Sequence, residues 1–239
     1  LPGRYADWAD VGYGTLGLAL GALAGLPLHR WAKRGHDGRE TSPARPPRLL
    51  LWGINYAPEM IGIGPFNARL ATWLDRHGWE VEVVTSFAYY PAWKKSPEDY
   101  WHGSRTDCCE GITVHRVWHY VPSKVTTVTR IFHEASFVVL SFLRAVTLPK
   151  QDLVFVVSPP LLLGGAAWLL GKLRGTRYLF HVQDLQPDAA VGLGMLSPGL
   201  FTRALFGIEA FAYAKAAGVS GISREMLAAF RAKGIPEPK

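Results

Sequence analysis

A strand, a glycine-rich turn and a helix follow one another between residues 49 and 77, and this succession constrains the fold more than any other feature. The apolar run Leu49–Ile54 predicts a buried parallel strand, and Phe66–His77 predicts a helix with one apolar face. Between them, Gly62, Ile63 and Gly64 place bare backbone N–H groups at the start of that helix. Such a turn suits a phosphate or diphosphate, because the N–H groups and the helix dipole both attract negative charge.

The spacing of these glycines argues against a nicotinamide cofactor. Asn67 stands where the dinucleotide fingerprint requires a third glycine after Gly62 and Gly64. The next predicted strand runs into Thr85-Ser86-Phe87, without the acid that would hold a ribose hydroxyl. A nucleotide-dependent epimerase or dehydrogenase is therefore disfavoured.

Short apolar runs alternate with helical patterns from Arg48 onward. Strands are predicted at Leu49–Ile54, Val81–Thr85, Ile112–Trp118, Leu153–Val157, Tyr178–Val182 and Gly218–Ile222. Helices are predicted at Phe66–His77, Thr127–Val146, Leu161–Leu173, Leu200–Ala216 and Arg224–Lys233. This alternation predicts an α/β fold, a doubly wound Rossmann-like domain whose parallel sheet is covered by helices on both faces.

Ligands of such sheets bind at the carboxyl ends of the strands. That rule places four segments at one rim, namely Gly62–Gly64, Ser158–Pro160, His181–Asp184 and the turn at Ser223. A phosphate-binding turn that faces a histidine across this rim indicates a group transferase whose donor carries a diphosphate.

His181 stands at the end of an apolar strand, where a lone histidine is most often a core residue. The neighbouring Gln183, Asp184 and Asp188 favour a functional role instead. The chain has no hydrolase elbow and no cysteine or histidine cluster with metal-ligand spacing, so we expect no metal site.

The segment 86–103 has little helical or strand periodicity, and long irregular loops inside compact domains are usually functional. Its aromatic residues include Tyr89, Tyr90 and Trp93, which suit stacking on sugar rings. The alternative is an aromatic cluster that closes the core beneath the loop.

The formal net charge of +7 is concentrated in the middle of the chain. Eight lysines and arginines oppose two acidic residues between His115 and Arg177. The predicted helix Thr127–Val146 also has a wide apolar face, and together with the basic excess this suits an anionic membrane surface. The alternatives are that the helix covers the sheet and that the basic residues are scattered, solvated charges. No nucleic-acid motif accompanies the charge, so no nucleic-acid partner is expected.

The adjacent Cys108 and Cys109 are expected to be free thiols of a reducing compartment.

Residues 1–47 differ in character from residues 48–239, which form the predicted domain. The stretch 11–28 is uncharged and a basic run follows it, so it reaches the threshold for a membrane span. Five glycines dilute its hydrophobicity, and an extension that does not span is the stronger expectation. Residues 35–47 are polar and contain proline, which is typical of a linker.

Several motifs occur in an order that identifies a family. They are Gly53-Ile-Asn-Tyr-Ala-Pro-Glu59, the turn Gly62-Ile-Gly64, Tyr89-Tyr-Pro-Ala-Trp-Lys94 and His181-Val-Gln-Asp-Leu-Gln-Pro-Asp188, followed by Gly192-Leu-Gly-Met195. Together they resemble the N-terminal half of a family 4-like glycosyltransferase, in particular the WcaI type of colanic acid synthesis.

The resemblance implies a two-domain GT-B fold, of which this half would hold the acceptor. It also implies a retaining transfer from a nucleotide sugar, with GDP-fucose as the expected donor and no other cofactor. The implied acceptor is a polyprenyl-diphosphate-linked saccharide. The resemblance also implies a cytoplasmic protein that binds peripherally to the inner face of the cell membrane.

Individual roles follow from the resemblance residue by residue. Backbone N–H groups of Gly62, Ile63 and Gly64 would meet the donor diphosphate. His181 would lie beside the reacting sugar, with Asp184 in the same motif. The acceptor pocket would be shaped by Asn55, Tyr89, Tyr90 and Trp93.

The chain departs from the family pattern in one respect. The family's second domain carries two glutamates eight positions apart that bind the donor, and no pair of glutamates here has that spacing. We therefore expect the donor half to be missing and this chain alone to be inactive. The alternative is a non-catalytic saccharide-binding or docking module that pairs with a separate donor-binding chain.

Overall fold

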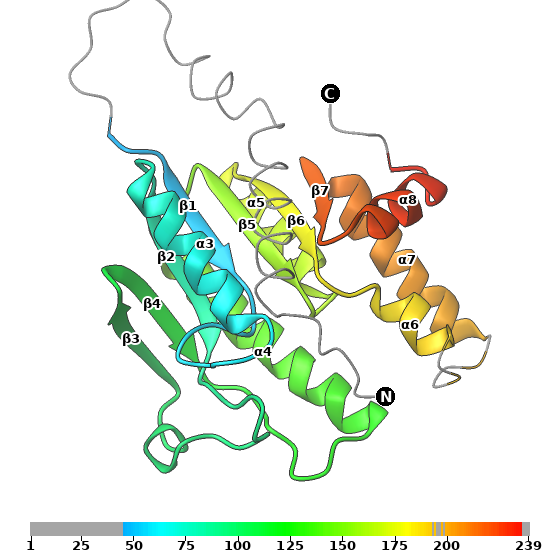
Figure 1. Ribbon diagram of the computed structural model, residues 1–239, viewed down its shortest axis with the longest axis horizontal. Helices are drawn as coiled ribbons and strands as arrows, with labels where there is room; N and C mark the ends of the chain where they lie inside the picture. Colours follow the sequence, from blue (N-terminus) through cyan, green and yellow to red (C-terminus); the bar gives the residue numbers. More distant parts are fainter. Residues whose placement is uncertain (1–44, 193, 195–196, 198, 236–239) are drawn as a thin grey trace, which may run out of the picture.

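The computed structural model describes residues 45–192, 194, 197 and 199–235. These residues form one seven-stranded sheet made of β1 (Arg48–Trp52), β2 (Glu80–Ser86), β3 (Ser104–Cys109), β4 (Ile112–Val117), β5 (Leu153–Ser158), β6 (Arg177–Val182) and β7 (Gly218–Gly221). Their order across the sheet is β3-β4-β2-β1-β5-β6-β7 (Figure 1). Every pairing is parallel except that of β3 with β4. The doubly wound α/β prediction is therefore confirmed.

The helices of the described residues cover both faces of this sheet. They are α3 (Gly64–Arg76), α4 (Thr127–Thr147), α5 (Leu163–Arg174), α6 (Gln186–Gly192), α7 (Leu200–Lys215) and α8 (Arg224–Ala232). On one face α3 packs against β1 and β2, with Leu70 and Leu74 in the same cluster as Leu51. On the other face Phe137 of α4 belongs to a second cluster with Trp52. Successive strand residues point to opposite faces, which explains why Leu51 and Trp52 enter different clusters.

The parallel register brings the carboxyl ends of six strands to one edge of the sheet. Trp52 of β1 pairs with Val84 of β2 and with Val156 of β5. Further along, Ser158 of β5 pairs with Val182 of β6. The turns that follow these strands therefore leave the sheet side by side, as the sequence predicts for the rim.

Most predicted elements end within two residues of the observed ones, but β3 and α6 were not expected. The β3 strand has the sequence Ser-Arg-Thr-Asp-Cys-Cys and alternates between exposed and half-buried residues. Among the strands of the described residues it lies at the edge of the sheet and pairs with β4 alone, so it needs few apolar side chains. The α6 helix is seven residues long and has Pro187 in its first turn.

Three further sequence predictions concern charge, thiols and membranes. Arg116, counted in the basic stretch, is buried and its Nε donates to Asp107 at 2.7 Å, so its charge does not reach the surface. Cys108 and Cys109 are free thiols, as expected. Within the described residues, no helix combines the length and apolarity that a membrane crossing needs. The candidate span 11–28 lies outside the described residues.

Candidate functional site

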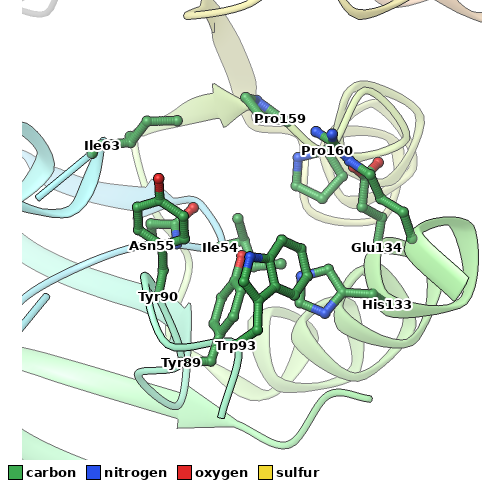
Figure 2. Close-up of a pocket in the computed structure, with 12 residues that line it drawn as sticks. Ile54, Asn55, Ile63, Tyr89, Tyr90, Trp93, His133, Glu134, Pro159 and Pro160 are labelled. Atoms are coloured by element: carbon green, nitrogen blue, oxygen red, sulfur yellow. The ribbon is translucent and has the colours of Figure 1, made fainter. Parts of the chain in front are cut away.

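A pocket of about 300 Å³ lies at the carboxyl edge of the sheet, beside the first turns of α4 (Figure 2). Five segments line it: Ile54 and Asn55 after β1, Gly62 and Ile63 before α3, Tyr89, Tyr90 and Trp93 after β2, Arg130, His133 and Glu134 in α4, and Pro159 and Pro160 after β5. The structure thus brings together six residues that the sequence predicted for the site, from two motifs and the turn between them.

Glu59 joins the first and third of these segments by hydrogen bonds. Its Oε2 accepts a hydrogen bond from Asn55 Nδ2 at 2.9 Å, and its Oε1 accepts from the backbone N–H groups of Tyr89 and Tyr90 at 3.2 and 3.1 Å. Burial of the carboxyl group raises the pKa of Glu59, and the three donors oppose that effect. The sequence predicted no role for Glu59, although it ends the first motif. In the structure it holds the aromatic loop against the end of β1.

The turn before α3 requires glycine for reasons of packing as well as of backbone access. Gly62 has a φ of +75°, and a Cβ there would lie 3.1 Å from the Tyr90 ring. A Cβ on Gly64 would lie 3.0 Å from Cβ of Glu59 and 3.1 Å from the carbonyl oxygen of Tyr56. Gly64 therefore packs inward and is not among the residues that line the pocket.

The start of α3 remains suited to an anion. The N-cap residue is Ile63, whose side chain makes no capping hydrogen bond, and the first turn contains no acidic residue. No side chain of α3 itself therefore compensates the positive end of the helix dipole, and the nearby carboxylate is that of Glu59, whose Oε2 lies 3.2 Å from where a Cβ on Gly64 would be. A diphosphate at this turn would meet backbone N–H groups, which stays a prediction from the sequence.

The aromatic loop closes the core and lines the pocket at the same time. Tyr89 is buried in the main apolar cluster, and its ring centroid lies 5.4 Å from that of Trp93 and 4.7 Å from that of His133. Trp93 and His133 are 5.2 Å apart in turn (Figure 2). Tyr90 is partly exposed at the pocket wall. The core-closing alternative therefore describes Tyr89, while stacking on a sugar ring stays a prediction for this loop.

The α4 helix supplies three pocket residues for which the sequence analysis predicted no role. Glu134 Oε1 accepts hydrogen bonds from Arg130 Nε at 3.1 Å and from Gln186 Nε2 at 3.0 Å. The Nδ1 atom of His133 lies 2.6 Å from the carbonyl oxygen of Tyr120, and burial lowers the pKa of His133 to about 4. At neutral pH this imidazole is uncharged. The pocket therefore combines aromatic faces, a neutral histidine and a carboxylate paired with an arginine.

His181 lies on the same edge of the sheet but does not line this pocket. It occupies β6 between Val157 and Ser220, and its Nδ1 lies 2.9 Å from the Ser220 hydroxyl. The side chain is buried, and this burial lowers the pKa of His181 to about 4, so the imidazole is neutral at pH 7. Its ring centroid is 5.5 Å from that of Phe155.

Asp184 follows β6 and is electrostatically coupled to the pocket. Its carboxylate raises the pKa of Glu134, although burial of Glu134 is the larger cause. Two residues further on, Gln186 donates to Glu134 and accepts from the backbone N–H of Leu161 at 3.0 Å. The segment after β6 is thereby tied to the pocket wall. Among the described residues no group of three histidine, cysteine, aspartate or glutamate side chains is arranged to hold a metal ion.

Comparison with known proteins assigns the family. Residues 62–239 match the model of the glycosyl transferase 4-like domain. The chain belongs to this glycosyl transferase 4-like family. The match begins at Gly62, so it includes the turn before α3, the aromatic loop, α4 and the segment that contains His181 and Asp184.

A relative supports the same assignment. WcaI of Escherichia coli (strain K12), a colanic acid biosynthesis glycosyl transferase by name, is 39% identical over 156 residues. The aligned region covers 64% of this chain and 38% of WcaI, so the chain matches well under half of that protein. The fold agrees with the family, because a sheet of parallel strands flanked by helices is what the N-terminal half of a GT-B glycosyltransferase requires.

Proposed function

We propose that this chain is the acceptor-binding half of a retaining glycosyltransferase in exopolysaccharide biosynthesis. The proposed reaction moves a sugar from a nucleotide sugar, GDP-fucose in the first instance, to a polyprenyl-diphosphate-linked saccharide. Family membership and the similarity to WcaI support the reaction class. The observation that carries the acceptor role is the pocket, because it places aromatic faces beside a few polar groups at the ligand-binding edge of the sheet.

In this proposal the two sides of the rim have different tasks. The N–H groups of Gly62, Ile63 and Gly64 meet the donor diphosphate at the uncapped start of α3. Tyr90 and Trp93 stack on the acceptor sugar, with Tyr89 beneath them, and Asn55 binds one of its hydroxyl groups. His181 and Asp184 act from the end of β6, where a neutral imidazole or its carbonyl orients the reacting sugar without serving as a base.

The outer face of α4 supports peripheral binding to the inner face of the cell membrane. Val128, Phe132, Val139 and Leu143 follow one another at spacings of four or seven positions, so they share one face, and all are exposed, Phe132 by 63% and Leu143 by 57%. A polar surface is the norm for the outward face of a helix on a soluble domain. Lys124 and Lys150 flank the helix and would contact anionic headgroups.

The acceptor role is tested by a transfer assay on the full-length gene product. Trp93→Ala should raise KM for the saccharide acceptor about tenfold, because stacking and apolar contact worth about 1.5 kcal/mol are lost, and should leave KM for the nucleotide sugar unchanged. Trp101→Ala is the matched control, since Trp101 lies in the same loop region but is 93% exposed and outside the pocket. An unchanged acceptor KM in Trp93→Ala would contradict the proposal. Acceptor binding without any transfer would favour a non-catalytic binding module.

A further inference from the structure

Glu134 presents an unused oxygen at the pocket wall. Its side chain is 17% exposed and lines the pocket. Both hydrogen bonds that it accepts, from Arg130 and Gln186, go to Oε1. Within the described part of the chain, Oε2 has no hydrogen-bond partner. A carboxylate oxygen has lone pairs for two hydrogen bonds, so Oε2 is available to a ligand.

The surroundings of Glu134 show which ligand group suits this oxygen. Burial and the carboxylate of Asp184 raise the pKa of Glu134, whereas Arg130 and Gln186 favour the ionised form. An ionised carboxylate only accepts hydrogen bonds. Because Arg130 pairs with Glu134 through Oε1, the carboxylate form is favoured and a ligand at Oε2 donates a hydrogen bond. A second negative charge at Oε2 would be repelled by both Glu134 and Asp184, since the charge of Arg130 is already paired.

The other residues that line the pocket indicate which kind of molecule could carry this donor group. Trp93 and Tyr90 present aromatic rings to the same pocket, and Asn55 adds an amide at its floor (Figure 2). A sugar ring has apolar C–H faces for the aromatic side and hydroxyl groups at its edge for the polar side. The ring of His133 lies 5.2 Å from that of Trp93 and is neutral at pH 7, and the guanidinium of Arg130, which also lines the pocket, is paired with Oε1 of Glu134.

We infer that Glu134 accepts a hydrogen bond from a hydroxyl group of the acceptor sugar and restricts this position to neutral sugars. The inference rests on the proposed function, since it names the substrate class of the same pocket. Glu134 orients the sugar through Oε2, while Arg130 and Gln186 hold the carboxylate in place through Oε1. A sugar with a carboxylate at this edge, such as a uronic acid, is disfavoured by like charge, because the cation of Arg130 is already paired with Glu134.

The test uses the 239-residue chain with two probes, methyl α-D-glucopyranoside and methyl α-D-glucopyranosiduronic acid, and measures dissociation constants by ligand-observed NMR. The chain should bind the neutral glycoside more tightly than the acid. Glu134→Gln should weaken binding of the neutral glycoside about tenfold, the scale for replacing a charged hydrogen-bond acceptor with a neutral one. In the same variant, the dissociation constants of the neutral glycoside and of the acid should differ less than they do in the unaltered chain. Glu225→Gln, on the exposed first turn of α8, is the matched control.

A pH series separates this role from a structural one. The groups that face Glu134 are Arg130 and His133 from α4, Tyr89 from the aromatic loop and Asp184 after β6. Binding of the neutral glycoside should weaken as the pH falls through the raised pKa of Glu134, and Glu134→Gln should lose that dependence. Equal affinity and an equal pH profile in the two proteins would overturn this inference and leave the pocket as a saccharide site. Failure of the unaltered chain to bind either glycoside would overturn the proposed function as well.

Discussion

Replacing Glu59 tests whether one buried carboxylate assembles the pocket. Glu59→Ala removes the acceptor of three hydrogen bonds, from the amide of Asn55 and the backbone N–H groups of Tyr89 and Tyr90. Hydrogen bonds to a charged group contribute about 1.5–3 kcal/mol each. Part of this is offset because the substitution also removes the cost of burying the carboxylate, the main cause of its raised pKa. We therefore expect Glu59→Ala to lower the free energy of unfolding by roughly 3–5 kcal/mol.

The isosteric Glu59→Gln variant should cost much less. Its carbonyl oxygen still accepts from both backbone N–H groups, and rotation of the Asn55 amide can offer an oxygen to the new amide. We expect a loss of about 1 kcal/mol. Because the pKa of Glu59 is raised in the folded state, the protonation-linked part of its contribution is present at low pH and is lost as the pH rises through the folded pKa, whereas the hydrogen bonds that the side chain accepts are a separate contribution. Glu59→Gln removes this pH dependence.

Urea denaturation followed by circular dichroism measures both effects. Glu98→Ala is the matched control, because Glu98 is an exposed residue of the same loop region and its substitution should change stability by no more than about 0.5 kcal/mol. A loss of under about 1 kcal/mol in Glu59→Ala would refute the reasoning, since the three donors would then have found other partners. Equal losses in the alanine and glutamine variants would show that side-chain volume, and not hydrogen bonding, is what Glu59 supplies.

Two further predictions concern His181 and α4. In the full-length gene product, His181→Ala should lower kcat about a hundredfold, and Ser220→Ala, which removes only the hydrogen bond to Nδ1, should not. A lower melting temperature with near-normal turnover would place His181 in the core instead. A chain that begins at Arg48 should sediment with vesicles of anionic lipid, and a Phe132→Ser, Leu143→Ser double variant should lose most of this binding, whereas Leu173→Ser on α5 should not. If the chain bound neutral and anionic vesicles equally well, the basic residues that flank α4 would not contribute to membrane binding.

The fold could be predicted because its central elements carry strong local patterns. The strands β1 and β5 are buried along most of their length and contain runs of Leu, Val and Phe. The α4 helix has a capping box at Thr126 and Thr129, and its predicted end at Val146 is one residue from the observed end. These signals are local, since each depends on residues within a few positions of one another.

The missing parts of the prediction depend on distant partners. The β3 strand is stabilised by pairing with β4, and its polar sequence has no strand pattern of its own. Glu134 becomes a pocket residue because of where α4 lies against the sheet, and its partner Gln186 comes 52 positions later in the chain. The sequence explains Gly64 by the approach of a diphosphate to its backbone N–H group, and the structure adds its close packing against Glu59. Tertiary proximity of this kind leaves no trace in a single sequence.

The geometry of α4 explains why its inward face changes character along its length. Because α4 follows β4, it begins at the carboxyl edge of the sheet and runs back across the face (Figure 1). Its later inward residues, Phe137 and Ala145, pack on the sheet in the apolar core. Its first turns extend past the end of the strands, so the same inward stripe there faces the pocket and carries Arg130, His133 and Glu134. Residues three and four apart share one face of a helix, so a single stripe serves the core and the site. The polar start of this stripe is therefore a signal for a site wherever a helix overhangs the edge of a parallel sheet.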